Sequence, residues 1–221
     1  MSSAAPVWLF DLDNTLHDAS AHIFLHINRS MTDYIASQLG LSNEAACTLR
    51  QDYWHRYGAT LTGLVRHHGT DPHHFLHETH QFDHLPALLV FERTLNTLLR
   101  RLPGRKIIFS NAPQDYAYRI LHLMKIRHHF EHIIGIEKLN LQPKPGINGY
   151  RRLLHTLRLP PSRCIMIEDS TVNLRTARRL GMHTVLVGRT PRRPSYIDIQ
   201  IRSILELHRA TRHLTTSFRK S

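Results

Sequence analysis

Short apolar runs alternate with longer amphipathic segments along the second half of the chain. The runs lie at residues 106–109, 132–136, 164–167 and 183–188, and the sequence also offers an edge strand at 196–201. Helical spacing of apolar residues predicts helices at 87–102, 114–125, 145–157, 172–180 and 203–213. Short apolar strands that alternate with helices are typical of a doubly wound, parallel sheet with right-handed crossovers. We therefore expect an α/β fold.

An isolated apolar run near the N-terminus ends in two acids. The four residues at 7–10, VWLF, show no polar alternation, which is typical of a strand buried on both faces. Asp11 and Asp13 follow, and residues two apart in an extended chain project to the same side. Open α/β sheets bind their ligands at the carboxyl ends of strands. This strand end is therefore a candidate active site.

The stretch between this strand and residue 86 has only helical patterns. Apolar residues recur every four positions from Ile23 to Leu39, and Gly40 provides a C-cap. Three further helices are expected after Ser42, after Gly58 and from Asp71. Helices without an intervening strand do not build a βαβ unit. We expect a discontinuous catalytic core (1–17 and 86–214) with a Rossmann-like sheet, an inserted helical cap (18–85) and a flexible tail (215–221).

Composition narrows the class of protein. The chain has 221 residues, 41% of them hydrophobic, and no apolar run approaches the length of a membrane span. It shows no signal-peptide pattern, so we expect a cytoplasmic protein without a membrane partner. The net charge is +12, but Lys and Arg occur singly or in pairs. Such dispersal favours a basic surface that attracts anionic substrates over specific nucleic-acid binding.

Further polar residues follow the predicted strands or precede a predicted helix. Together with the first two acids they are Asp11, Asp13, Ser110, Asn111, Lys144, Glu168 and Asp169. A parallel sheet would bring them around one crevice. Four neighbouring carboxylates need a neutralising cation, and an all-oxygen ligand set suits Mg²⁺. A hard metal beside a lysine and a helix N-terminus suits a phosphate group, so the expected partner is a small phosphorylated substrate.

Four segments resemble the motifs of the haloacid dehalogenase superfamily of phosphohydrolases. They are DLDNT at 11–15, SNA at 110–112, KP at 144–145 and EDSTVN at 168–173, in that order, and the resemblance extends from about residue 7 to residue 188. It implies that Asp11 is the nucleophile that forms an aspartyl-phosphate. Asp13 would be the general acid and then the general base.

The same resemblance implies roles for the remaining motif residues. Mg²⁺ would be held by Asp11, Glu168, Asp169 and the backbone carbonyl of Asp13. Ser110 and Lys144 would bind the transferring phosphoryl oxygens, while Asn111 and Thr15 would complete the phosphate site by supporting its loops. Asp13 argues against a dehalogenase, because a halide leaving group needs no acid and dehalogenases of this family lack the second aspartate.

A narrower resemblance concerns the substrate. DLDNTLH at 11–17, the cap segment MTDYI and the EDSTVN motif are similar to the pyrimidine 5'-nucleotidase branch, which implies a pyrimidine nucleoside 5'-monophosphate as substrate. His17 stands where this branch has Tyr, and Ser110 where Thr is commoner. In the cap, Asn28 and Tyr57 are candidates for contacts with base or sugar.

Several alternatives stay open at this point. The enzyme could act on phosphoglycolate, a sugar phosphate or pyridoxal phosphate, or it could be a phosphomutase, which also needs Asp13. An alternative of another class is a non-catalytic module that binds anions or nucleic acid with its +12 surface.

Overall fold

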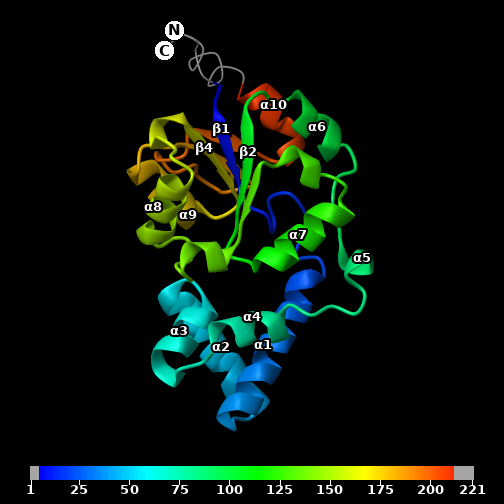
Figure 1. Cartoon of the computed structure of the whole chain (residues 1–221), viewed down its shortest axis with the longest axis vertical. Helices are drawn as coiled ribbons and strands as arrows, with labels where there is room; N and C mark the ends of the chain where they lie inside the picture. Colours follow the sequence, from blue (N-terminus) through cyan, green and yellow to red (C-terminus); the bar gives the residue numbers. More distant parts are fainter. Residues whose placement is uncertain (1–4, 212–221) are drawn as a thin grey trace.

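A six-stranded, fully parallel sheet forms the centre of the computed structural model, which describes residues 5–211 (Figure 1). The strands are β1 (Val7–Phe10), β2 (Arg105–Phe109), β3 (His132–Ile134), β4 (Cys164–Glu168), β5 (His183–Val187) and β6 (Ile199–Ile201). Their order is β3-β2-β1-β4-β5-β6, and every neighbouring pair is parallel. The structure confirms the α/β fold with a parallel sheet that the sequence predicts.

Strand β1 lies in the middle of the sheet because all four of its side chains are apolar and buried. Trp8 and Phe10 belong to the apolar cluster on one face, and Val7 and Leu9 belong to the cluster on the other face. Such burial on both faces is typical of central parallel strands.

Helices cover both faces of the sheet. They are α6 (Leu95–Arg101), α7 (Gln114–Leu123) and α10 (Leu207–Ala210) on the face of Trp8, and α8 (Ile147–Thr156) and α9 (Thr171–Arg179) on the face of Leu9. Short 3₁₀ turns occupy Arg127–His129, Ile136–Leu139, Pro161–Arg163 and Ile204–Glu206. The result is a three-layered core.

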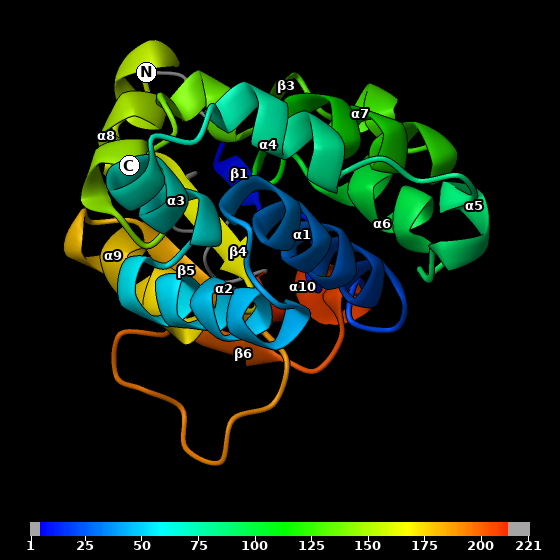
Figure 2. The ribbon, with the colours of Figure 1, turned by 90° about the horizontal axis from the view of Figure 1, so that it is seen from below.

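Four helices lie together beyond one edge of the sheet (Figure 1), and Figure 2 views the molecule from their side. They are α1 (Ile23–Leu39), α2 (Asn43–Tyr57), α3 (Thr60–His68) and α4 (Pro72–Thr79). Gly40 ends α1 in the left-handed conformation, with φ 64°, and the Ser42 hydroxyl accepts a hydrogen bond from the Ala45 N–H. The sequence predicts both of these features, the glycine C-cap and the serine N-cap. The division into a core (1–17 and 86–214) and a cap (18–85) stays a prediction.

The two connections between the core and the cap helices run side by side. The N–H of Asp18, on the outgoing connection, donates to the carbonyl of Val90, on the returning one, at 2.8 Å. The single helix predicted at 87–102 is therefore wrong. The chain forms a short helix α5 (Leu85–Leu88), becomes extended at Leu89 with ψ 115°, and starts α6 only at Leu95. The extended stretch is what returns the chain to the sheet.

Two further predicted helix boundaries are also wrong. Pro145 does not stand in the first turn of a helix, because α8 starts at Ile147 after Gly146. The Thr176 hydroxyl donates to the Pro145 carbonyl at 2.8 Å and holds this loop in place. At the other end, the helix predicted at 203–213 is a 3₁₀ turn followed by the short α10. The predicted tail (215–221) lies outside the described residues. Within residues 5–211, no helix has the length and apolar character that crossing a membrane requires.

We predict that Gly63→Ala weakens the packing of α3 on α2. A methyl group at Gly63 would lie 2.2 Å from Cγ of Tyr53, so a side chain must shift. Although Ala favours a helix over Gly, we expect a net loss of about 1–2 kcal/mol in the free energy of unfolding, measured by urea titration. In a Tyr53→Ala background the same change should cost less. An equal cost in both backgrounds would contradict this packing.

Candidate active site

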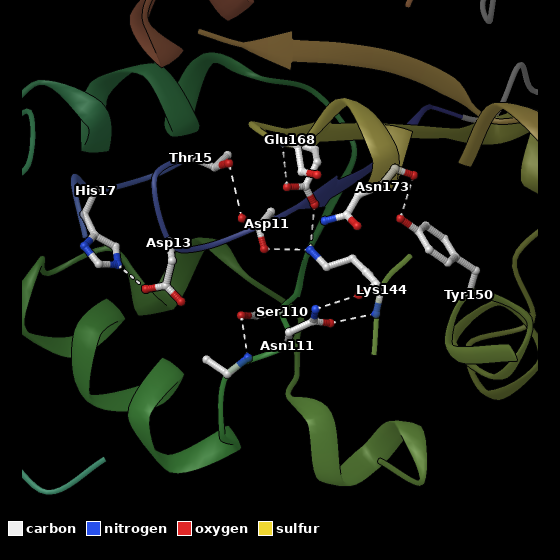
Figure 3. A network of polar contacts seen from close by, with 12 residues as sticks. Asp11, Asp13, Thr15, His17, Ser110, Asn111, Lys144, Tyr150, Glu168 and Asn173 are labelled. Atoms are coloured by element: carbon white, nitrogen blue, oxygen red, sulfur yellow. Dashed lines mark hydrogen bonds and ion pairs between the residues drawn. The ribbon is translucent and has the colours of Figure 1, made fainter. Parts of the chain in front are cut away.

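The carboxyl ends of three strands bring the predicted site residues together (Figure 3). Phe10 pairs in register with Ile108 of β2 and Ile167 of β4. Because the three strands end at the same level, Asp11, Ser110 and Glu168 meet at one edge of the sheet. All three are buried.

Lys144 reaches the same edge from the loop before α8. Its ammonium Nζ lies 2.6 Å from Oδ1 of Asp11 and 2.7 Å from Oε2 of Glu168, and the side chain is buried. Burial lowers the pKa of Lys144, but attraction by Asp11 and Glu168 outweighs it, so the pKa is raised. The lysine is therefore positively charged at neutral pH.

Asn111 fixes the backbone of that lysine. Its side-chain Nδ2 donates to the carbonyl of Lys144 at 2.9 Å, and its Oδ1 accepts from the N–H of Lys144 at 2.8 Å. Both side-chain groups of Asn111 are thus used to position the loop. Asn111 therefore holds the loop of Lys144 in place.

The site is also short of positive charge. Carboxylate oxygens of Asp11, Glu168 and Asp169 lie within 4.8 Å of one another. In the described part of the chain, the ion pairs of Asp11 and Glu168 are both made with the ammonium of Lys144. Burial, followed by repulsion from Glu168, raises the pKa of Asp11 to about 7. Burial also raises the pKa of Glu168 to about 7, although Lys144 opposes the shift. Three oxygen ligands with uncompensated charge fit a hard divalent cation such as Mg²⁺, so these residues could hold one.

Asp13 has different surroundings from Asp11. The Tyr116 hydroxyl donates to its Oδ1 at 2.7 Å, and Nε2 of His17 lies 2.9 Å from the same oxygen. Burial raises the pKa of Asp13, but the contacts with His17 and Tyr116 outweigh burial, and the pKa is lowered below its ordinary value. The two acids of the first motif are therefore shifted in opposite directions.

The remaining predicted residues divide into two groups. Thr15 and Ser110 lie in the site: the Thr15 hydroxyl donates to Oδ2 of Asp11 at 3.3 Å, and the Ser110 hydroxyl accepts from the Ala112 N–H at 3.0 Å. Asn28 and Tyr57 make their hydrogen bonds within the cap helices. Asn28 accepts from Arg50 at 2.8 Å, and the Tyr57 hydroxyl lies 2.6 Å from Nε2 of His67. The structure does not bring these two into contact with the carboxylates.

Tyr116 and His80 lie beside the site but were not predicted from the sequence. Tyr116 lies on the buried face of α7, and periodicity makes it look like an ordinary core residue. His80 follows α4, its ring packs edge-on against Tyr116 at 5.6 Å between centroids, and burial lowers its pKa to about 4. Both residues reach the surroundings of Asp13 only because the fold brings together segments that are distant in the sequence. His17, by contrast, is visible in the sequence as a departure from the motif.

The fold and the site define a class of proteins with a parallel α/β sheet and an aspartate directly after a central strand. A sequence profile of the haloacid dehalogenase-like hydrolases matches residues 8–187, and the chain belongs to this family.

One curated relative and two solved structures illustrate the range of this family. The relative is Phosphate metabolism protein 8 of Saccharomyces cerevisiae, 26% identical over 199 residues that cover 83% of this chain and 61% of the relative. The chain thus spans less than two thirds of that protein.

Both solved structures resemble this chain over most of its length. A HAD phosphatase from Thermococcus onnurineus has a TM-score of 0.65 at 20% identity and covers 92% of this chain and 96% of its own. An L-2-haloacid dehalogenase from Xanthobacter autotrophicus has a TM-score of 0.59 at 15% identity and covers 93% and 97%. A phosphatase and a dehalogenase share the fold, so the fold alone does not decide which reaction the site residues catalyse.

We predict that Mg²⁺ stabilises the protein, and more at about pH 8 than at about pH 5. Because the folded-state pKa values of Asp11 and Glu168 are raised, stability without the cation falls as pH rises through about 7. Mg²⁺ binds the ionised carboxylates, so the stabilisation that it provides grows over the same pH range. At a Mg²⁺ concentration of about 100 Kd, this stabilisation reaches about 2.7 kcal/mol. Thermal unfolding with MgCl₂ or EDTA measures it.

Two variants check that the effect arises at this cluster. Asp169→Asn removes one of the three charges, so the shift in Tm should shrink. Asp52→Asn changes an exposed residue of α2 and should keep the wild-type shift. An equal shift in both variants, or none in the wild type, would contradict a cation site here.

Proposed function

We propose that this hydrolase is a Mg²⁺-dependent phosphomonoesterase that works through an aspartyl-phosphate on Asp11. The observation that carries the proposal is the second acid, Asp13, which lies beside Asp11 and is held by two hydrogen-bond partners. An alcohol leaving group needs a proton, whereas a halide does not. An acid at this place is therefore useful to a phosphatase and has no task in a dehalogenase.

The first chemical step would transfer the phosphoryl group to the enzyme. The Asp11 carboxylate attacks phosphorus, a bond from carboxylate oxygen to phosphorus forms, and the bond from phosphorus to the ester oxygen breaks. Asp13 gives its proton to the departing oxygen. Lys144 keeps Asp11 ionised and, with the Ser110 hydroxyl, stabilises the charge on the phosphoryl oxygens.

The second step would release phosphate. Water attacks phosphorus, a bond from the water oxygen to phosphorus forms, and the bond from phosphorus to the Asp11 oxygen breaks. Asp13, now ionised, accepts the proton that the water loses. Asp13 must hold a proton before the first step, although its pKa is lowered in the free site. The negative phosphate of a bound substrate raises that pKa. A bound Mg²⁺, held by Asp11, Glu168 and Asp169, would supply positive charge beside the transferring group.

For the substrate we propose a pyrimidine nucleoside 5'-monophosphate. The support is the similarity of DLDNTLH and EDSTVN to the pyrimidine 5'-nucleotidase branch. The end of α2 also lies against the lysine loop, because a Cβ at Gly58 would be 3.0 Å from Cδ of Pro145. Tyr57 is therefore adjacent in sequence to Gly58, the residue that packs against the loop of Lys144. The names of the yeast relative and the Thermococcus structure support a phosphorylated substrate in general.

We predict phosphate release from phosphomonoesters in the presence of Mg²⁺ and its loss in EDTA. Asp11→Asn should lower kcat by at least about a thousandfold, because the nucleophile is removed. Asp52→Asn changes an exposed residue of α2 that is not among the proposed site residues, and it should retain wild-type kcat. A malachite-green assay of released phosphate measures both. Full activity in Asp11→Asn would contradict the mechanism.

A panel of substrates separates the remaining possibilities. We expect UMP and CMP to give higher kcat/KM than phosphoglycolate, sugar phosphates or pyridoxal phosphate. Turnover of phosphoglycolate without UMP or CMP would contradict the proposed substrate and leave the chemistry intact. Steeply salt-dependent nucleic-acid binding without any turnover would contradict the enzyme itself.

A further inference from the structure

One oxygen of the Asp13 carboxyl is held from two sides. The Tyr116 hydroxyl donates to Oδ1 at 2.7 Å, and Nε2 of His17 lies 2.9 Å from that same oxygen. An sp² carboxylate oxygen has two lone pairs, and two donors occupy both of them. Figure 3 shows the second oxygen turned away from His17. Within the described residues, both hydrogen bonds to this carboxyl fall on Oδ1.

The surroundings of His17 fix it as a donor. Its side chain is fully buried, and Nδ1 has no hydrogen-bond partner in the described part of the chain. A proton on Nδ1 would be a buried donor without an acceptor, which costs about 1–3 kcal/mol. The tautomer with its proton on Nε2 avoids that cost and donates to Asp13. A backbone bridge between Asp13 and His17 closes the same turn.

Tyr116 is held as firmly as His17. Its ring is buried on α7 and contacts His80 at 5.6 Å and Phe82 at 5.7 Å, both measured between ring centroids. Arg119, one turn further along α7, donates to the carbonyl of His80 at 2.8 Å. The connection that returns from the cap helices therefore packs on the tyrosine that donates to Asp13.

We infer that His17 and Tyr116 are positioning residues that occupy Oδ1 of Asp13 and leave Oδ2 as the oxygen that carries the proton to the leaving group. The inference rests on the proposed phosphomonoesterase function. It follows that the two residues matter most where the leaving oxygen needs a proton. A leaving group that is stable as an anion should depend on them little.

The test compares two substrates on the same protein samples. p-Nitrophenyl phosphate releases a stabilised phenolate, whereas the best alkyl phosphomonoester of the panel releases an alkoxide that must be protonated. In Tyr116→Phe we expect kcat/KM to fall about tenfold for the alkyl ester and less than about threefold for p-nitrophenyl phosphate. Because kcat/KM covers only the steps through leaving-group departure, slow hydrolysis of the aspartyl-phosphate does not mask the effect.

Three further variants sharpen the comparison. His17→Leu should show the same selective loss, and His17→Gln, whose amide can donate from about the place of Nε2, should recover part of it. Tyr118→Phe removes a hydroxyl from the exposed side of α7 and should leave both values unchanged. The ratio of the two kcat/KM values is independent of the fraction of active protein, so partial misfolding does not imitate the result.

The possible outcomes separate this inference from the proposed function. Equal losses for both substrates in Tyr116→Phe and His17→Leu, or no loss in either, would overturn the positioning role while leaving a phosphatase. A wild-type protein that hydrolyses neither substrate would overturn the proposed function, and the inference with it. A selective loss with the alkyl ester is the result expected.

Discussion

The buried ammonium of Lys144, between Asp11 and Glu168, is the interaction on which the rest of the site depends. It joins the ends of two strands to a loop, and Asn111 anchors that loop through the lysine backbone. Removing one partner from a buried ion pair costs about 3–5 kcal/mol, because the charge left behind stays desolvated. The pair forms only because the parallel register ends β1 and β4 at the same level.

The two acids of the first motif show how one strand can serve two tasks. Asp11 faces charged groups and, being buried among acids, has a raised pKa. Asp13, two residues on, faces His17 and Tyr116 and has a lowered pKa. The first arrangement suits a nucleophile that a lysine and a cation keep ionised. The second suits an acid whose orientation is fixed and whose proton is gained only beside a negatively charged substrate.

Local patterns in the sequence were enough to predict the sheet, most helices and the convergence of Asp11, Ser110, Lys144 and Glu168, because strand ends in a parallel sheet meet by geometry. Features that depend on distant segments were not predictable. The break after Leu88 follows from the return of the chain beside Asp18, and the hydroxyl of Tyr116 meets an acid 103 residues away. For Asn28 and Tyr57, the sequence predicted a place in the cap helices but not their hydrogen-bond partners.

The proposed mechanism requires that Asp11 carries the phosphoryl group during turnover. Acid quenching during steady-state turnover of a phosphomonoester with Mg²⁺, followed by peptide mass spectrometry, tests it directly. We expect one added phosphoryl group on the peptide that contains Asp11, absent from Asp11→Asn and retained in Asp52→Asn. Turnover accompanied by a phosphoryl group on another residue would contradict it.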